Sequence, residues 1–457
     1  MTKTEPGNLP PRIVRPPPGP RSRRLSARLA ATESRNVTFL SPDFPIFWRR
    51  ARGSNVWDAD GNRYVDLSAG FGVAAAGHRS RRVVAALRAQ AGRLPHGMGD
   101  VHPPEIKVRL LERLASIAPV PDPRIVLATS GAEAVEIALK TARLATGRPG
   151  VLAFRGAYHG LTYGALSVTD RALFREPFAD QLNPHVVRVD FPNPFRVPDG
   201  ADRDALAREA AAAVAAALDD PAAPPVGAVI VEPIQGRGGE IVPPRGFLPA
   251  LAVLCRDRGA LLIADEIFTG LGRTGRLFAC EEEGIVPDLL CVGKSLSGAL
   301  PLSACIGTSR LMDAWPTSEG EAKHTSTFLG NPLACAAALA SLTEIQRLDL
   351  AGRARIEGER WLRELTRMAA GHPGVAEVRG RGLMIGVEIV RAEGGRERPD
   401  GPRTGRILVE ALRRGWIVLA GGAASNVVSL TPPLTISSSL LAASVDILDE
   451  VLAATAS

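Results

Sequence analysis

The sequence has no apolar stretch that approaches the roughly 20 residues a membrane-spanning helix needs. The nearest candidate, the alanine-rich segment 205–218, is interrupted by Arg208 and Glu209. The first residues also lack the apolar segment of a secretory signal. We therefore expect a soluble cytoplasmic protein that has no membrane partner.

Cysteine is scarce, and the few cysteines are scattered along the chain. They form no CxxC pair and have no histidine at the spacing of a metal ligand, so neither a disulfide framework nor a zinc site is expected. We predict reduced core thiols at Cys255, Cys280, Cys291, Cys305 and Cys335.

Lysine is rare although the net charge is +7. The five lysines are Lys3, Lys107, Lys140, Lys294 and Lys323. Much of the basic excess lies in residues 1–24, which hold six basic residues, one acid and seven prolines. Such a segment, without apolar residues to form a core, predicts a disordered tail over 1–35 rather than a nucleic-acid partner.

Beyond about residue 120, short apolar runs alternate with helical stretches. The runs are nearly continuous in valine, isoleucine and leucine, which is typical of a parallel sheet covered by helices on both faces. Strands are predicted at 124–128, 150–154, 186–190, 226–232, 260–265 and 288–293. Helices are predicted at 130–145, 201–219 and 247–258. The pattern predicts an α/β fold with a mostly parallel sheet.

Shorter elements flank this α/β core on both sides. Residues 36–100 contain small strands around the turn signal Asp60-Gly61-Asn62. The C-terminal part predicts helices at 333–347, 352–370 and 403–414, and strands at 382–390, 416–420 and 427–431. We predict a large α/β domain over 101–340 and a smaller α+β domain over 341–457, to which 36–100 contributes an N-terminal segment.

Two strand ends carry residues suited to an anion or a buried charge, and ligands bind at the carboxyl ends of such strands. Ser130, Gly131 and Ala132 open a helix, whose free N–H groups suit a phosphate, although a plain helix cap uses the same residues. Asp265 ends an apolar strand, where a buried carboxylate needs a cation or a donor; a solvated acid is the alternative.

Two further strand ends carry a lysine and an aromatic residue. Lys294 follows the strand at 288–293, where desolvation favours a nucleophilic amine; a salt-bridge partner is the alternative. Tyr158 and His159 are bracketed by glycines, which allows an aromatic ring to approach a planar ligand; a packed loop residue is the alternative.

Together these segments resemble the class III (ω-) aminotransferases of pyridoxal-phosphate (PLP) fold type I, from about residue 40 to the C-terminus. The most specific segments are LLIADEIFTGLGRTG (261–275) and PDLLCVGKSLSGALPLSA (287–304). Supporting segments are SGAEAVEIALKTAR, FRGAYHG, VEPIQG, HTSTFLGNPLACAAAL and VSLTPPLTI. The resemblance implies an aspartate aminotransferase-like fold, PLP as cofactor, and ping-pong transamination between small-molecule amine and oxo substrates.

The resemblance also assigns roles to single residues. Lys294 carries PLP as a Schiff base and then shuttles a proton, and Asp265 pairs with the pyridine nitrogen. Thr327 resembles a hydroxyl given to the phosphate by the neighbouring subunit, which implies a homodimer with shared active sites. The other implied cofactor contacts are Tyr158, Ile267, Ser130, Gly131, Ala132, His159 and Glu232.

Four positions on the substrate side depart from the family's usual residues. Leu161 and Ser429 stand where arginines bind the two carboxylates of many family substrates. Arg237 replaces a frequent glutamate, and Phe268 a common glutamine. We therefore expect a biosynthetic or ω-amine substrate rather than 4-aminobutyrate or acetylornithine, with Arg237 as a replacement anion contact or, alternatively, solvated or paired with a glutamate.

Other functions on the same fold stay open. A PLP-dependent aminomutase of the glutamate-semialdehyde type, or a lyase, is the nearest alternative, although GLGRTG (270–275) resembles the aminotransferase version of that segment. A binding protein without catalysis is a further alternative, and Lys294 with Asp265 argues against it because binding alone does not need both.

Overall fold

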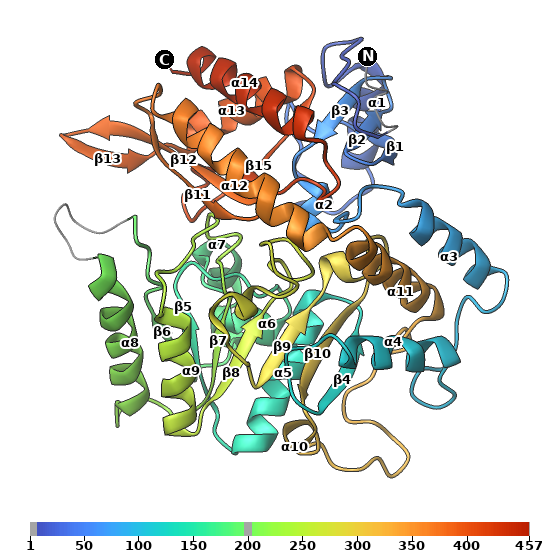
Figure 1. Cartoon of the computed structure of the whole chain (residues 1–457), viewed down its shortest axis with the longest axis vertical. Coiled ribbons are helices and arrows are strands. Elements are labelled where there is room, and N and C mark those ends of the chain that lie inside the picture. Colours follow the sequence, from blue (N-terminus) through green and yellow to red (C-terminus); the bar gives the residue numbers. More distant parts are fainter. Residues whose placement is uncertain (1–6, 196–202, 457) are drawn as a thin grey trace.

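The computed structural model of the chain describes residues 7–195 and 203–456. Its largest sheet has seven strands in the order β4-β10-β9-β8-β7-β5-β6 (Figure 1). The strands are β4 (Pro123–Ala128), β5 (Gly150–Phe154), β6 (Val186–Val189), β7 (Val226–Val231), β8 (Leu261–Asp265), β9 (Leu289–Val292) and β10 (Ser303–Thr308). The five strands from β9 to β6 pair in parallel, and β10 is antiparallel to both of its neighbours. The predicted α/β fold with a mostly parallel sheet is confirmed.

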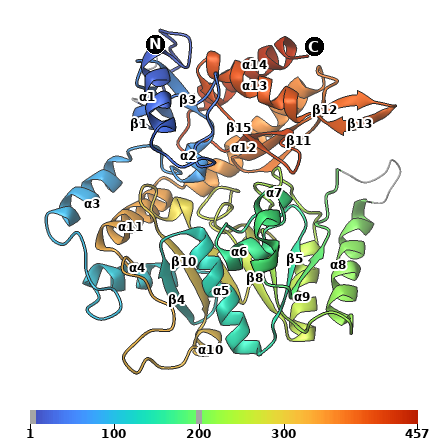
Figure 2. The same ribbon diagram turned by 180° about the vertical axis from the view of Figure 1, so that it is seen from behind.

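Helices cover both faces of this sheet. α5 (Gly131–Thr146) lies on one face (Figure 2), and α8 (Arg203–Asp219) and α9 (Phe247–Arg258) lie on the other (Figure 1). Strand β7 shows the consequence, because Ala228 and Ile230 join the apolar cluster under α5 while Val229 and Val231 join the cluster under α9. Burial on both faces explains why the strands are nearly continuous apolar runs in the sequence.

Two smaller sheets combine the two ends of the chain. The first has the order β1 (Trp48–Arg52), β2 (Asn55–Asp58), β3 (Arg63–Asp66) and β14 (Trp416–Ile417), with β14 parallel to β3. The second has the order β11 (Val375–Arg381), β12 (Met384–Glu393), β16 (Val427–Leu430) and β15 (Leu419–Gly421), and β13 (Arg396–Pro399) pairs with β12. N-terminal and C-terminal segments therefore form one layer above the large sheet (Figure 1).

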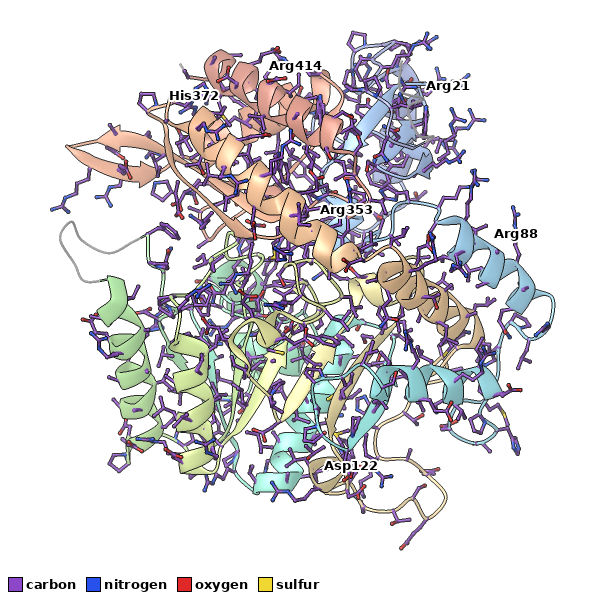
Figure 3. All side chains as sticks on the ribbon, in the orientation of Figure 1. Arg21, Arg88, Asp122, Arg353, His372 and Arg414 are labelled. Carbon is purple, nitrogen blue, oxygen red and sulfur yellow. The ribbon has the colours of Figure 1, made fainter. Side chains whose placement is uncertain are left out.

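Three C-terminal helices pack in this upper layer: α12 (Leu350–Ala369), α13 (Gly401–Arg413) and α14 (Ser438–Ala454). Arg353 on α12 (labelled in Figure 3) donates to the carbonyl oxygens of Leu434 (3.0 Å) and Ile436. The remaining α-helices are α1 (Pro20–Ala30), α2 (Ala69–Gly72), α3 (Arg81–Ala91), α4 (Glu105–Ala115), α6 (Tyr163–Val168), α7 (Ala172–Arg175), α10 (Ser309–Met312) and α11 (Pro332–Arg347). Short 3₁₀ helices lie at Glu176–Gln181, Ala279–Glu283 and Lys294–Leu296.

The N-terminal segment differs from the sequence-based expectation. A disordered tail over 1–35 is wrong for residues 7–35, which include α1 and a bridge between Arg12 and Arg63; residues 1–6 lie outside the described residues. The turn after β2 holds this segment through its side chains. Asp60 accepts the backbone N–H groups of Arg21 (2.7 Å) and Ser22 (2.9 Å).

Asn62 of the same turn accepts the backbone N–H groups of Val14 (2.8 Å) and Arg15 (3.0 Å). The Asn62 bonds replace hydrogen bonds to water that this proline-rich segment would otherwise keep, whereas the Asp60 bonds satisfy the first N–H donors of α1. Composition alone does not reveal such partners, because they lie about 40 residues away in the sequence.

No helix within residues 7–195 and 203–456 is long and apolar enough to cross a membrane.

Candidate active site

A cavity of about 320 Å³ lies at the carboxyl ends of β5, β7, β8 and β9, beside the first turn of α5. Its lining includes every predicted site residue except Thr327 and Ser429, together with Gly160. The lining residues are Ser130, Gly131, Ala132, Tyr158, His159, Gly160, Leu161, Glu232, Arg237, Asp265, Ile267, Phe268 and Lys294. The parallel topology therefore brings together residues that are up to 164 positions apart, from Ser130 to Lys294.

The first turn of α5 offers free backbone donors to the cavity. Ser130 caps the helix, and its Oγ accepts the N–H of Glu133 at 3.2 Å. Gly131 has no room for a larger side chain, since a Cβ there would lie 3.0 Å from two carbon atoms of Ile267. The N–H groups of a helix N-terminus bind phosphate well when small residues let it approach.

Gly160 lets the loop after β5 close onto the same helix. Its φ is +128°, and a Cβ at this position would lie 2.5 Å from the Cβ of Ala132. A larger residue would both strain the backbone and push Tyr158 and His159 away from α5.

Asp265 ends β8 with a side chain that is 4 % exposed. Its Oδ2 lies 2.7 Å from Nδ1 of His159, and its Oδ1 accepts the N–H of Ile267 at 3.1 Å. Nε2 of His159 is buried and has no hydrogen-bond partner in the part of the chain that the structure describes. The imidazole thus fixes one carboxylate oxygen and balances the burial cost that the sequence predicted for this acid.

Lys294 lies two residues after the end of β9, opens a short 3₁₀ helix, and has a φ of +43°. Burial lowers the pKa of its amine, while Asp265 and Glu232 act in the opposite direction. The Nζ atom lies 4.3 Å from the ring centroid of Phe268. A buried amine with a lowered pKa has a larger neutral fraction and can attack a carbonyl.

Glu232 connects two loops that line the cavity. Its carboxylate accepts the N–H of Tyr158 at 2.9 Å and the N–H of Gly236 at 3.0 Å. Burial raises the pKa of Glu232. The side chain therefore holds the Tyr158 loop against the loop that carries Arg237.

Arg237 points to the cavity beside Tyr158, with its Cζ atom 5.6 Å from the ring centroid. Within the described residues it forms no ion pair with Glu232 or Glu240, and its Nε atom is buried without a hydrogen-bond partner. Leu161 lines the same cavity and is half exposed. Arg237 thus lines the cavity, and its role as an anion contact stays a prediction.

Ser429 lies outside the lining of the cavity. Its Oγ donates to Oε1 of Glu240 at 2.5 Å, and burial raises the pKa of Glu240 to about 8. Thr327 is exposed just before α11 and also lies outside this lining. Its contact with the phosphate of a partner subunit stays a prediction.

Two contacts at the site could not be found from spacing. His159 and Asp265 are 106 residues apart, and Glu240 and Ser429 are 189 residues apart. A buried acid indicates that some partner exists, but only the three-dimensional arrangement identifies which residue it is.

The residues present fit pyridoxal 5'-phosphate. The first turn of α5 offers N–H donors for a phosphate, Asp265 offers a fixed carboxylate for a protonated pyridine nitrogen, and Lys294 offers an amine for the aldehyde. All three groups line one cavity, as a single small cofactor requires.

Comparisons with known proteins agree with this site. The family model for Aminotransferase class-III matches residues 39–452. A 4-aminobutyrate aminotransferase of Mycobacterium leprae is 41 % identical over 95 % of this chain and 96 % of its own. A 5-aminovalerate aminotransferase of Pseudomonas aeruginosa is 37 % identical over 89 % of this chain and 93 % of its own.

Solved structures show the same similarity. An amine transaminase from an uncultivated Pseudomonas species, in its PLP-bound form, has a TM-score of 0.85 and 32 % identity over 92 % of this chain and 98 % of its own. An (S)-enantioselective omega-transaminase from Thermomicrobium roseum has a TM-score of 0.87 and 32 % identity over 95 % and 98 %. The chain belongs to the class III aminotransferases and is a PLP-dependent aminotransferase.

Proposed function

We propose that this enzyme transaminates an ω-amine substrate whose far end carries an anion, and that Arg237 binds that anion. The observation that carries the proposal is the position of Arg237, whose guanidinium faces the cavity beside Tyr158 and has no carboxylate partner among the described residues. A half-buried guanidinium without a counter-ion is costly, and an oxyanion offers it the paired hydrogen bonds that its planar fork favours.

The neighbouring positions support this assignment. Leu161 has no polar group, and Ser429 has already given its hydroxyl to Glu240. Relatives named for 4-aminobutyrate and 5-aminovalerate also support a substrate with an amine at one end and a carboxylate at the other. These names lean against the sequence-based preference for a substrate other than 4-aminobutyrate.

Bound PLP supplies an electron-accepting ring and a carbonyl that takes up and returns the amino group. Lys294, as a buried amine with a lowered pKa, is placed to take and return the proton at the amine-bearing carbon of the substrate. Asp265, held by His159, keeps a proton on the ring nitrogen. Phe268 packs beside the amine of Lys294.

We also propose that the active unit is a homodimer. Thr327 is exposed in the single chain, and the adjacent Phe328 is 60 % exposed, as expected for residues that a second subunit covers. In this arrangement Thr327 donates to the phosphate in the site of the partner.

The substrate proposal is tested with two amines of equal length, 5-aminovalerate and pentylamine. Arg237→Gln should lower kcat/KM for 5-aminovalerate about 10- to 150-fold, which corresponds to a loss of roughly 1.5–3 kcal/mol in transition-state stabilisation. The kcat/KM for pentylamine should not change. The matched control is Arg245→Gln, which removes the same charge at an exposed position. Equal losses for both amines, or none for either, would show that Arg237 does not bind a substrate anion.

A further inference from the structure

Arg171 is not one of the residues that line the cavity, but it contacts neighbours of the residues that contact Arg237. It precedes α7, and its Cζ atom lies 5.5 Å from the ring centroid of Phe174. Phe174 in turn packs edge-on against Tyr158, with ring centroids 6.0 Å apart. Since Arg237 lies 5.6 Å from the Tyr158 ring, the two guanidinium groups flank one aromatic pair.

The turn between β15 and β16 connects the two arginines a second time. The N–H of Gly422 donates to the backbone carbonyl of Arg237 at 3.0 Å, and the N–H of Ser425 donates to the carbonyl of Gly422 at 3.0 Å. Nη2 of Arg171 lies 3.5 Å from Oγ of Ser425, a long contact that leaves most of its donors free. One short turn therefore contacts both arginines.

The positive charges of Arg171 and Arg237 act on each other. Burial lowers the pKa of Arg171, and the charge of Arg237 lowers it further. Within the described residues neither guanidinium is within 4.0 Å of a carboxylate oxygen. Of the nearby acids, Glu232 accepts two backbone N–H groups. Glu240 accepts the Ser429 hydroxyl through Oε1, and its buried Oε2 has no hydrogen-bond partner among the described residues.

Two like charges in a partly buried place raise the free energy of the folded protein, because little water is there to screen their repulsion. The faces of Tyr158 and Phe174 offset part of this cost, and an oxyanion between the guanidinium groups would offset more. The pair also repels a second amine. The arrangement therefore distinguishes an amine that ends in an anion from a diamine.

We propose that Arg171 is a second anion-binding residue, which acts with Arg237 to hold the far end of the substrate between two guanidinium groups. The substrate class is the ω-amine of the proposed function, whose far end carries an anion. This inference rests on the proposed function, because it assigns a partner to Arg237.

The test uses the holoenzyme and glutarate, a dicarboxylate that cannot be transaminated. Glutarate binding is measured by calorimetry in the wild type, Arg171→Gln, Arg237→Gln, the double variant and the control Arg245→Gln. Each single variant at Arg171 or Arg237 should weaken glutarate binding by about tenfold or more, and Arg171→Lys should retain part of the affinity. Arg245→Gln should bind glutarate as the wild type does.

Kinetics with 5-aminovalerate, pentylamine and 1,5-diaminopentane complete the test. The Arg171→Gln variant should lose activity toward 5-aminovalerate, keep it toward pentylamine, and gain activity toward the diamine. If Arg237→Gln weakens glutarate binding and Arg171→Gln does not, the two-arginine site is refuted while the proposed function stands. If neither variant weakens glutarate binding, the two-arginine site and the proposed function are both refuted. Loss of pentylamine activity or of thermal stability in both Arg171 variants would show a structural role and overturn the inference.

Discussion

Lys107 and Lys294 are both lysines whose pKa is lowered by burial, and their surroundings distinguish them. The Nζ atom of Lys107 donates to the carbonyl of Gly99 at 2.6 Å. Lys294 instead lines the cavity with Asp265, where an aldehyde could reach it. A lowered pKa alone therefore does not identify the nucleophilic lysine, whereas the groups that surround each lysine do.

Borohydride reduction of the holoenzyme, followed by peptide mapping, should place the cofactor on Lys294. Lys294→Ala should abolish both turnover and this adduct while the fold is retained, since the phosphate and pyridine contacts come from other residues. Lys107→Ala serves as the control and should keep the adduct. An adduct on Lys107, Lys140 or Lys323 would contradict the assignment.

The motifs predicted the residues that line the cavity, but not how those residues hold each other. Lys294 and Asp265 stand at strand ends, and a strand end has a fixed place in a parallel sheet. The position of Ser429 shows the limit of this reasoning. The family motif predicted Ser429 on the substrate side of the cofactor, yet its hydroxyl donates to Glu240, because a buried carboxyl group needs a hydrogen-bond donor.

At the scale of elements, β16 meets the loop after β7 through the Ser429–Glu240 hydrogen bond. Burial raises the pKa of Glu240 to about 8, so the folded enzyme keeps a proton there at pH values where the unfolded chain has lost it. The stabilisation is present in full below the ordinary glutamate pKa of 4.5 and is lost as the pH rises toward about 8.

Glu240→Gln should remove this part of the pH dependence. In the wild type Glu240 alone should lower the free energy of unfolding by up to about 1.4 kcal/mol for each pH unit between about pH 5.5 and about pH 7.5. Urea unfolding of both proteins at the two pH values measures the difference. Glu105→Gln, at an exposed position, is the control, and equal slopes in the wild type and Glu240→Gln would contradict the raised pKa.

The strands of the large sheet were predictable because both of their faces are buried, which imposes long apolar runs. β10 was not predicted, since its SACIGT run has small residues and pairs antiparallel between β4 and β9. α1 was missed for a different reason. Its stability depends on Asp60, which lies in a distant turn, and not on its own arginine-rich composition.

At the scale of the whole molecule, the proposed homodimer makes Thr327 a residue of the partner's site. Thr327→Ala should weaken PLP binding by about 1–2 kcal/mol, which is the scale of one charge-assisted hydrogen bond. Cofactor binding measured by fluorescence, together with sedimentation, tests this expectation. A fully active monomer would contradict it.

Mixing two variants separates a shared site from a local one. In a dimer of one Lys294→Ala chain and one Thr327→Ala chain, a shared arrangement places both defects in one site and leaves the other site intact. Tight PLP binding and activity at limiting PLP should then return in the mixture. If Thr327 served the site of its own chain, the only site with Lys294 would stay weakened, and no recovery would occur.

The parallel pairing of β14 with β3 also sets an order for the folding of a newly made chain. Strand β3 ends at Asp66, whereas β14 begins at Trp416, and Asn8 donates to the carbonyl of Thr435. At synthesis rates of about 5–20 residues per second, the first strands wait roughly 20–70 s for these partners. The seven-stranded sheet, complete at Thr308, is made in between. The hairpin of β1 to β3 is therefore made before the seven-stranded sheet but can pair with β14 only after that sheet is complete.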